Sequence, residues 1–141
     1  MNKKIFIFLL VLTNIASFAE VHRNDTTNEV LTDNGLVWQD VKLNATQKQS
    51  YKMAIGYCHQ LAIKTKQNWH IPDKNEIEEI IDTSKVPSIN STFRYCANDG
   101  YWLDGKLPSG SVSWIDFNDG VVYYGSGFDR RLYVRCVRNT K

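Results

Sequence analysis

The first nineteen residues have the pattern of a secretory signal peptide, which decides the redox chemistry open to this chain's cysteines. Lys3 and Lys4 precede an unbroken apolar run over residues 5–12, and small residues, Ser17 and Ala19, precede a cleavage site before Glu20. The apolar run is too short to span a bilayer. We therefore expect a periplasmic or secreted protein that is not inserted in the membrane once residues 1–19 are removed, and that folds where disulfides form.

Cleavage at this point leaves a chain without net formal charge. The sequence holds 17 Lys and Arg residues and 15 Asp and Glu residues. The signal peptide takes away Lys3 and Lys4 and no acid, so 15 of each remain. A protein that binds nucleic acid through its overall charge would be strongly basic, so we expect no nucleic-acid partner.

The amino-terminal part of the mature chain predicts a hairpin between two polar stretches. Residues 20–28 are polar, and we expect a flexible lead-in before a domain that covers residues 29–138. Asn34-Gly35 supplies the positive φ values of a tight turn, which predicts strands over residues 29–32 and 36–39. The polar residues 40–49 are expected to form a linker.

Two helices are predicted next. Ser50 suits an N-cap, and the apolar residues after it recur at three- and four-residue spacing, which predicts a helix over 51–63. Asp73 and Glu76 have the spacing of a capping box, which predicts the start of a second helix over 74–82.

The last third of the chain predicts short antiparallel strands. Alternating apolar residues between Asn-, Asp- and Gly-rich turns indicate strands over 101–103, 111–117, 121–124 and 131–138. Helices that are segregated from a strand-rich half indicate an α+β fold. We expect two helices packed on one twisted antiparallel sheet.

Three cysteines allow one disulfide, with three alternative pairings. Cys58 falls on the apolar face of the first predicted helix, and Cys136 shares a face of the last predicted strand with Val134. A bridge between them could join that helix to the sheet. Cys96 lies in an irregular stretch, and we expect it to be the free thiol, either buried and inert or forming a dimer through a bridge between chains.

Six motifs in order resemble the bacterial Lcl C-terminal domain family, whose members typically contain G-L-M-W-Q, A-x-x-Y-C and D-W-R-L-P. The motifs here are Gly35-Leu36-Val37-Trp38-Gln39, Ala54 with Tyr57-Cys58, Asn68-Trp69-His70-Ile71-Pro72, Tyr101-Trp102, Ser113 to Gly120, and Val134-Arg135-Cys136-Val137-Arg138. The resemblance covers about residues 29–138. Asn68 and His70 depart from it, because they stand where Asp and Arg are usual.

The resemblance implies a C-type-lectin-like fold, related to that of formylglycine-generating enzymes. Cys58–Cys136 would then correspond to that fold's bridge between a helix and the last strand. The family occurs mainly in exported bacterial proteins. One collagen-like member uses the domain to bind host polysaccharides and promote adhesion, and no general activity is known for the family.

No pattern of residues points to catalysis or to a metal. His22, His59 and His70 are scattered without H-E-x-x-H spacing, and no G-x-S-x-G motif is present. We therefore expect a protein that is not an enzyme, with no catalytic residue, no metal and no cofactor.

The aromatic and basic residues of the last third are the candidates for ligand binding. An exposed aromatic ring beside guanidinium groups suits an anionic glycan, although the same residues could form an ordinary solvated strand end. The candidate ligand-binding residues are Trp102, Tyr123, Tyr124, Arg130 and Arg131. We expect an exported binding module for an anionic surface polysaccharide or an extracellular protein partner. The alternative is a small envelope structural protein that acts through protein–protein contact.

Overall fold

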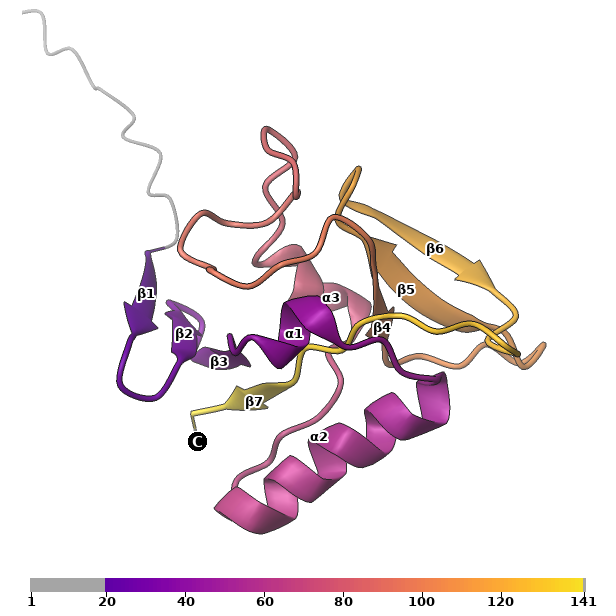
Figure 1. Cartoon of the computed structure of the whole chain (residues 1–141), viewed down its shortest axis with the longest axis horizontal. Helices are drawn as coiled ribbons and strands as arrows, with labels where there is room; N and C mark the ends of the chain where they lie inside the picture. The colour runs from indigo at the N-terminus through magenta and orange to yellow at the C-terminus, as the bar shows by residue number, and fades with distance from the viewer. Residues whose placement is uncertain (1–19, 141) are drawn as a thin grey trace, which may run out of the picture.

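The computed structural model describes residues 20–140, so the predicted signal peptide lies outside the described residues. The first of two antiparallel sheets has the strand order β1-β2-β3-β7 (Figure 1). Its strands are β1 (Val21–Asn24), β2 (Glu29–Thr32), β3 (Leu36–Gln39) and β7 (Val137–Asn139). The predicted hairpin is confirmed as β2 and β3, with Gly35 at a φ of 81° in the turn.

The second sheet contains three consecutive strands in the order β4-β5-β6. They are β4 (Gly100–Leu103), β5 (Val112–Asp116) and β6 (Val121–Gly125). All three strands agree with the sequence-based expectation within one residue at each end. The turn between β5 and β6 contains Gly120 at a φ of 72°, where a residue with a side chain would be strained.

In the part of the chain that the structure describes, three helices connect and cover the sheets: α1 (Leu43–Thr46), α2 (Tyr51–Thr65) and α3 (Lys74–Glu78). The Ser50 side chain caps α2 by accepting a hydrogen bond from the Met53 N–H, and Asp73 and Glu76 form the predicted capping box of α3. α3 ends earlier than expected. The chain turns there because the Ile80 carbonyl accepts a hydrogen bond from the Asn90 N–H, 2.8 Å away, instead of from a following helical turn.

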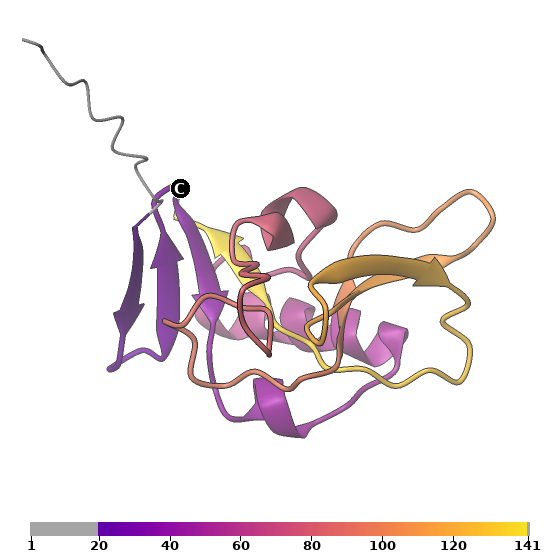
Figure 2. The same ribbon diagram turned by 90° about the horizontal axis from the view of Figure 1, so that it is seen from above.

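The core has two apolar clusters, and α2 packs against both sheets in one of them (Figure 2). That cluster joins Ala54 and Cys58 of α2 to Val37 of β3 and Trp102 of β4. Segment 132–137 passes between the clusters. Val134 and Cys136 face the cluster with α2, whereas Val137 faces the other, as the alternation in the sequence predicts.

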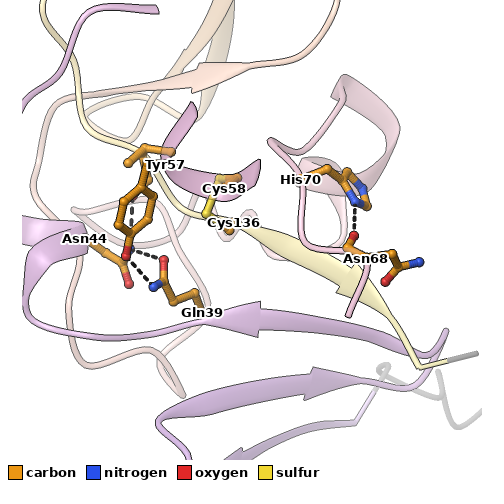
Figure 3. The surroundings of a disulfide bond; sticks show 8 residues. Gln39, Asn44, Tyr57, Cys58, Asn68, His70 and Cys136 are labelled. Atoms are coloured by element: carbon orange, nitrogen blue, oxygen red, sulfur yellow. Dashed lines mark hydrogen bonds between the residues drawn. A yellow bond between two sulfur atoms is a disulfide. The ribbon is translucent and has the colours of Figure 1, made fainter. Parts of the chain in front are cut away.

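A disulfide joins Cys58 of α2 to Cys136, the residue that precedes β7 (Figure 3). Their Cα atoms are 5.6 Å apart, and 78 residues separate them in the sequence. Cys96 is free and half-buried. The bridge and the free thiol are therefore those expected.

Two predictions for polar segments are wrong. Residues 20–28 are not a loose lead-in, because Val21–Asn24 pairs with β2 and Arg23 bonds to the buried carboxylate of Asp40. Residues 40–49 are not a plain linker, because they contain α1 and the fully buried Asn44. Asn44 donates hydrogen bonds to Gln39 Oε1 at 2.9 Å and to the Val134 carbonyl at 3.0 Å, which explains how a polar residue is buried there.

The predictions of one sheet, two helices and a long last strand also need correction. Within residues 20–140 there are two sheets and three helices. Only residues 137 and 138 of the predicted strand 131–138 belong to a sheet, as part of β7. Before it, Leu132 bridges Gln49 and Tyr133 bridges Tyr101, so the segment crosses from the second sheet to the first.

Candidate functional site

The face of the second sheet that packs against α2 carries, toward its β6 edge, an aromatic pair with an arginine over it. Trp114 of β5 lies opposite Tyr123 of β6 in the strand register, and their rings stack with centroids 6.3 Å apart at 19°. The Arg130 guanidinium lies 4.2 Å from the centre of the Trp114 ring. Tyr123 is 41% exposed and Trp114 is half-buried. We call Trp114, Tyr123 and Arg130 the Trp114 surface.

The polar side chains of the Trp114 surface are each held by one hydrogen bond to a neighbouring residue. Within residues 20–140, the Arg130 side chain makes one hydrogen bond, from Nε to the Ser126 carbonyl at 3.5 Å, so its terminal nitrogens stay free to donate. Tyr123 donates its hydroxyl proton to Asp119 Oδ2 at 2.5 Å. This hydrogen bond raises the pKa of Tyr123 and lowers the pKa of Asp119, so the phenol stays protonated and the carboxylate charged.

Tyr124 and Arg131 lie apart from the Trp114 surface. Successive residues of a strand face opposite sides, so Tyr124 is on the other side of β6 from Tyr123, where it lines a hollow with Lys74 and Lys106. It is 51% exposed. The exposed Arg131 donates from Nη2 to the Lys48 carbonyl at 3.2 Å.

Trp102 is buried and is removed from the ligand-binding candidates. Its side chain is 0% exposed, and its Nε1–H donates to the Gln49 carbonyl at 2.8 Å. The ring meets Tyr51 and Trp114 edge to face. Trp102 therefore packs beside Trp114 on the same face of the sheet and presents no surface to a ligand.

Trp114 is the residue that sequence reasoning left out of the candidate set. The signal was present, because Trp114 precedes the Asn118-Asp119-Gly120 turn by about as many residues as Tyr123 follows it. Residues at matched distances from a hairpin turn lie opposite each other and pair their side chains.

A second hollow lies beside the carboxyl-terminal end of β6, in the second sheet. It has a volume of about 420 Å³ and is lined in part by Lys52, Lys106, Val112, Phe128 and Asp129. Phe128 is 85% exposed, an unusual position for a phenylalanine. The two lysines add positive charge beside an apolar ring.

His70 forms an ion pair although it departs from the residue usual at its position. Its Nε2 lies 3.0 Å from Glu76 Oε2, and its Nδ1 lies 2.8 Å from the Asn68 carbonyl (Figure 3). The hydrogen bond to Glu76 raises the pKa of His70. Burial alone would raise the pKa of Glu76, but the hydrogen bonds from His70 and from the Asp73 N–H lower it overall. His70 also lines a small pocket with Ile55, His59 and Asp104.

Cys96 lies beside a buried charged group rather than at the surface. It packs against the core cluster that contains Tyr101, and burial raises the pKa of its thiol despite the nearby Arg135. A protonated, half-buried thiol is a weak nucleophile. This position favours the inert role over the bridge between chains.

Neither a metal-binding cluster nor a membrane-crossing helix is found among the described residues. Within residues 20–140, no three His, Cys, Asp or Glu side chains come together in a way that could hold a metal ion. None of the helices in that range has the length and apolar character needed to cross a bilayer.

Comparison with protein families gives one match. The family model described as "Lcl C-terminal domain" matches residues 29–138, which include both sheets except β1 and the last residue of β7. No curated protein and no solved structure matches the chain.

Proposed function

Because the chain belongs to the Lcl C-terminal domain family, we propose that it is an exported, non-enzymatic binding module for anionic surface polysaccharide. One observation carries the proposal: the Arg130 guanidinium lies over Trp114 beside the exposed Tyr123. The ligand would contact these three residues. C-type-lectin-like architecture is part of the same proposal, supported by the family and by the bridge from α2 to the residue before β7.

The chemistry of the Trp114 surface suits an acidic sugar. An aromatic face packs against the apolar C–H side of a pyranose ring, while guanidinium donors bind a sulfate or carboxylate in a planar, two-point arrangement. Trp114 and Tyr123 are held by paired strands, and the Trp114 ring orients Arg130, so little side-chain entropy is lost on binding.

The electrostatic attraction for an acidic glycan would come from the Arg130 charge and not from the overall charge of the protein. The mature chain has no net formal charge, and the Asp119 carboxylate is bonded to Tyr123 of the Trp114 surface. Binding should therefore weaken with salt, but less steeply than for a strongly basic protein.

Export is supported by the disulfide. Bridges of this kind persist in oxidising compartments such as the periplasm and the extracellular space. The predicted signal peptide at residues 1–19 supports the same location.

A glycan array with sulfated, uronic and neutral polysaccharides tests the proposal. We expect binding to the acidic polymers, reduced about tenfold or more in Arg130→Ala, because a charge-assisted hydrogen bond contributes roughly 1.5–3 kcal/mol. Arg130→Lys keeps the charge but loses the flat guanidinium, so it should bind weakly too. Arg131→Ala is the matched control and should bind nearly as well as the unchanged protein. Equal binding by Arg130→Ala, or no acidic glycan bound, would contradict the proposal.

Action through protein–protein contact, as an envelope structural protein, is the second candidate. The observation in its favour is that apolar side chains are exposed at both ends of β6, Val121 at its start and Phe128 after its last residue. A pull-down with the mature protein that recovers one envelope protein, and loses it in Phe128→Ser, would support this candidate.

A further inference from the structure

The outer edge of the second sheet has no strand beside it. β6 pairs with β5 on one side, and no strand within residues 20–140 pairs with its other side (Figure 1). An open edge offers unpaired backbone N–H and C=O groups to any strand that can reach it.

The register identifies these unpaired groups. The Phe117 N–H donates to the Asp99 carbonyl at 3.1 Å, on the β4 side of β5. Backbone groups alternate in direction along a strand, so those of Asp116, Trp114 and Val112 point to β6. Their partners in the register are Val121, Tyr123 and Gly125. It follows that the backbone groups of Val122 and Tyr124 point outward from the sheet.

β6 also lacks the features that normally protect an edge. Its sequence, VVYYG, contains no charged residue and no proline, and five consecutive pairs with β5 leave no bulge. The exposed edge of the first sheet differs, because β1 contains His22 and Arg23. Natural edge strands usually carry a charge, a proline or a bulge to prevent pairing with another chain. The absence of all three in β6 points to a partner strand.

We propose that this partner is β6 of a second copy of the chain. An antiparallel pair related by a two-fold axis at Tyr123 places Val122 opposite Tyr124 of the second copy, and Tyr124 opposite its Val122. The outward groups of these residues then form four backbone hydrogen bonds, and the two second sheets become one continuous sheet of six strands.

The charges at the two ends of β6 suit this arrangement. Asp116 and Asp119 lie at the Val121 end, whereas Arg130 and Arg131, together with Asp129, follow the Gly125 end. An antiparallel pair brings the acidic end of one copy beside the net basic end of the other, twice. The mature chain carries no net formal charge that would oppose association. This dimer does not depend on the proposed glycan binding.

The mass of the protein in solution, measured by light scattering over a concentration series, tests the dimer. The protein produced from the full chain should shift from the mass of one chain toward that of two as concentration rises. Tyr124→Pro removes an outward N–H without touching a bond to β5, so it should abolish the shift. Tyr124→Ser loses the same side chain but keeps the N–H, so it should still dimerise. A molar mass that equals that of one chain at every concentration would overturn the proposal. The edge of β6 would then be open to a strand of another protein.

A register-specific disulfide gives a second measurement that does not depend on the proline variant. In a Cys96→Ser background, Tyr123→Cys places two thiols opposite each other at the two-fold axis, where the Cα atoms are about 4.5 Å apart and a disulfide fits. Tyr124→Cys faces Val122 instead. Only the first variant should form a covalent dimer without reductant. Equal crosslinking of both variants, or of neither, would overturn the proposed register.

Discussion

Asp40 and Arg135 form a buried ion pair: the Arg135 Nη1 lies 3.0 Å from Asp40 Oδ1, and both side chains are fully buried or nearly so. The carboxylate also accepts hydrogen bonds from Arg23 and from the N–H groups of Arg94 and Tyr95. The Asp40 carboxylate therefore connects four parts of the chain: β1, the segment after β3, the irregular stretch before β4, and the segment before β7. Arg135 is further held by its carbonyl acceptors and by the Phe93 ring, 4.8 Å from the guanidinium.

Asp40→Ala should therefore destabilise the protein strongly. Removing the carboxylate leaves the buried Arg135 guanidinium without its counter-ion and takes from Arg23 its buried acceptor, which costs about 3–5 kcal/mol of unfolding free energy. Urea unfolding with the disulfide intact measures the change. Asp25→Ala is the control, because Asp25 pairs with Arg23 and Arg94 at the exposed surface and should contribute less than about 1 kcal/mol. Similar losses in the two variants would contradict a structural role for Asp40.

Removal of the Cys58–Cys136 bridge should lower the unfolding free energy by up to about 4–5 kcal/mol. The bridge closes a loop of 78 residues, and the chain-entropy model gives this figure for the restriction of the unfolded state. Chemical unfolding of Cys58→Ala/Cys136→Ala compared with the unchanged protein measures it, and Cys96→Ala serves as the control without loss of a bridge. A double variant as stable as the control would show that the bridge contributes nothing.

All three cysteines should react poorly with thiol-modifying reagents in the folded protein. The sulfurs of Cys58 and Cys136 are joined in a disulfide and buried, so alkylation of undenatured protein without reductant should modify neither residue. Cys96 should react more slowly than a free cysteine at neutral pH, because burial raises the pKa of its thiol and reduces the thiolate fraction. Thiol titration with a chromogenic disulfide, followed by peptide mapping, checks both expectations. Rapid reaction of Cys96 would instead favour a covalent dimer through that residue.

The His70–Glu76 pair should stabilise the protein most at mildly acidic pH. The pKa of His70 is raised in the folded state, so its contribution is complete below about pH 6.5 and is lost as pH rises through the folded pKa. The pKa of Glu76 is lowered, so its contribution is present above about pH 4.5 and is lost as pH falls through the folded pKa. Both side chains are partly exposed, so we expect less than about 1 kcal/mol.

Stability curves against pH for the unchanged protein and His70→Gln measure this effect. The difference between them should be largest between about pH 4.5 and 6.5 and should shrink above that window. Glu76→Gln is the matched variant, because glutamine still completes the capping box of α3 while the charge is lost. A difference that does not vary with pH would show that the pair acts through packing alone.

Local signals predicted the elements whose causes lie within a few residues. Ser50 and the Asp73–Glu76 pair place the starts of α2 and α3, because a side chain caps a helix only from an adjacent turn. Asn34-Gly35 placed the β2–β3 hairpin for a similar reason. The free Cys96 and the Cys58–Cys136 bridge agreed with expectation because each cysteine's face follows from the period of its own helix or strand.

Polar segments were the main errors. Residues 20–28 and 40–49 look like loops because their composition is polar, yet Arg23, Asp40 and Asn44 lie inside the protein. Their partners are up to 95 residues away, and only those partners offset the cost of burying polar groups. Burial was also unpredictable at the candidate site. The sequence places Trp102 in a strand, but it does not show that the side chain is buried.

The sequence by itself determined the type and order of most helices and strands, the bridge between helix and carboxyl-terminal segment, and the family. The tertiary structure alone decided that the strands divide into two sheets, that Trp102 is covered, and that Arg130 lies over Trp114. The physical reason is the range of the interactions. Capping, turns and alternation act between neighbours, whereas burial and the stacking of side chains depend on which distant segments pack together.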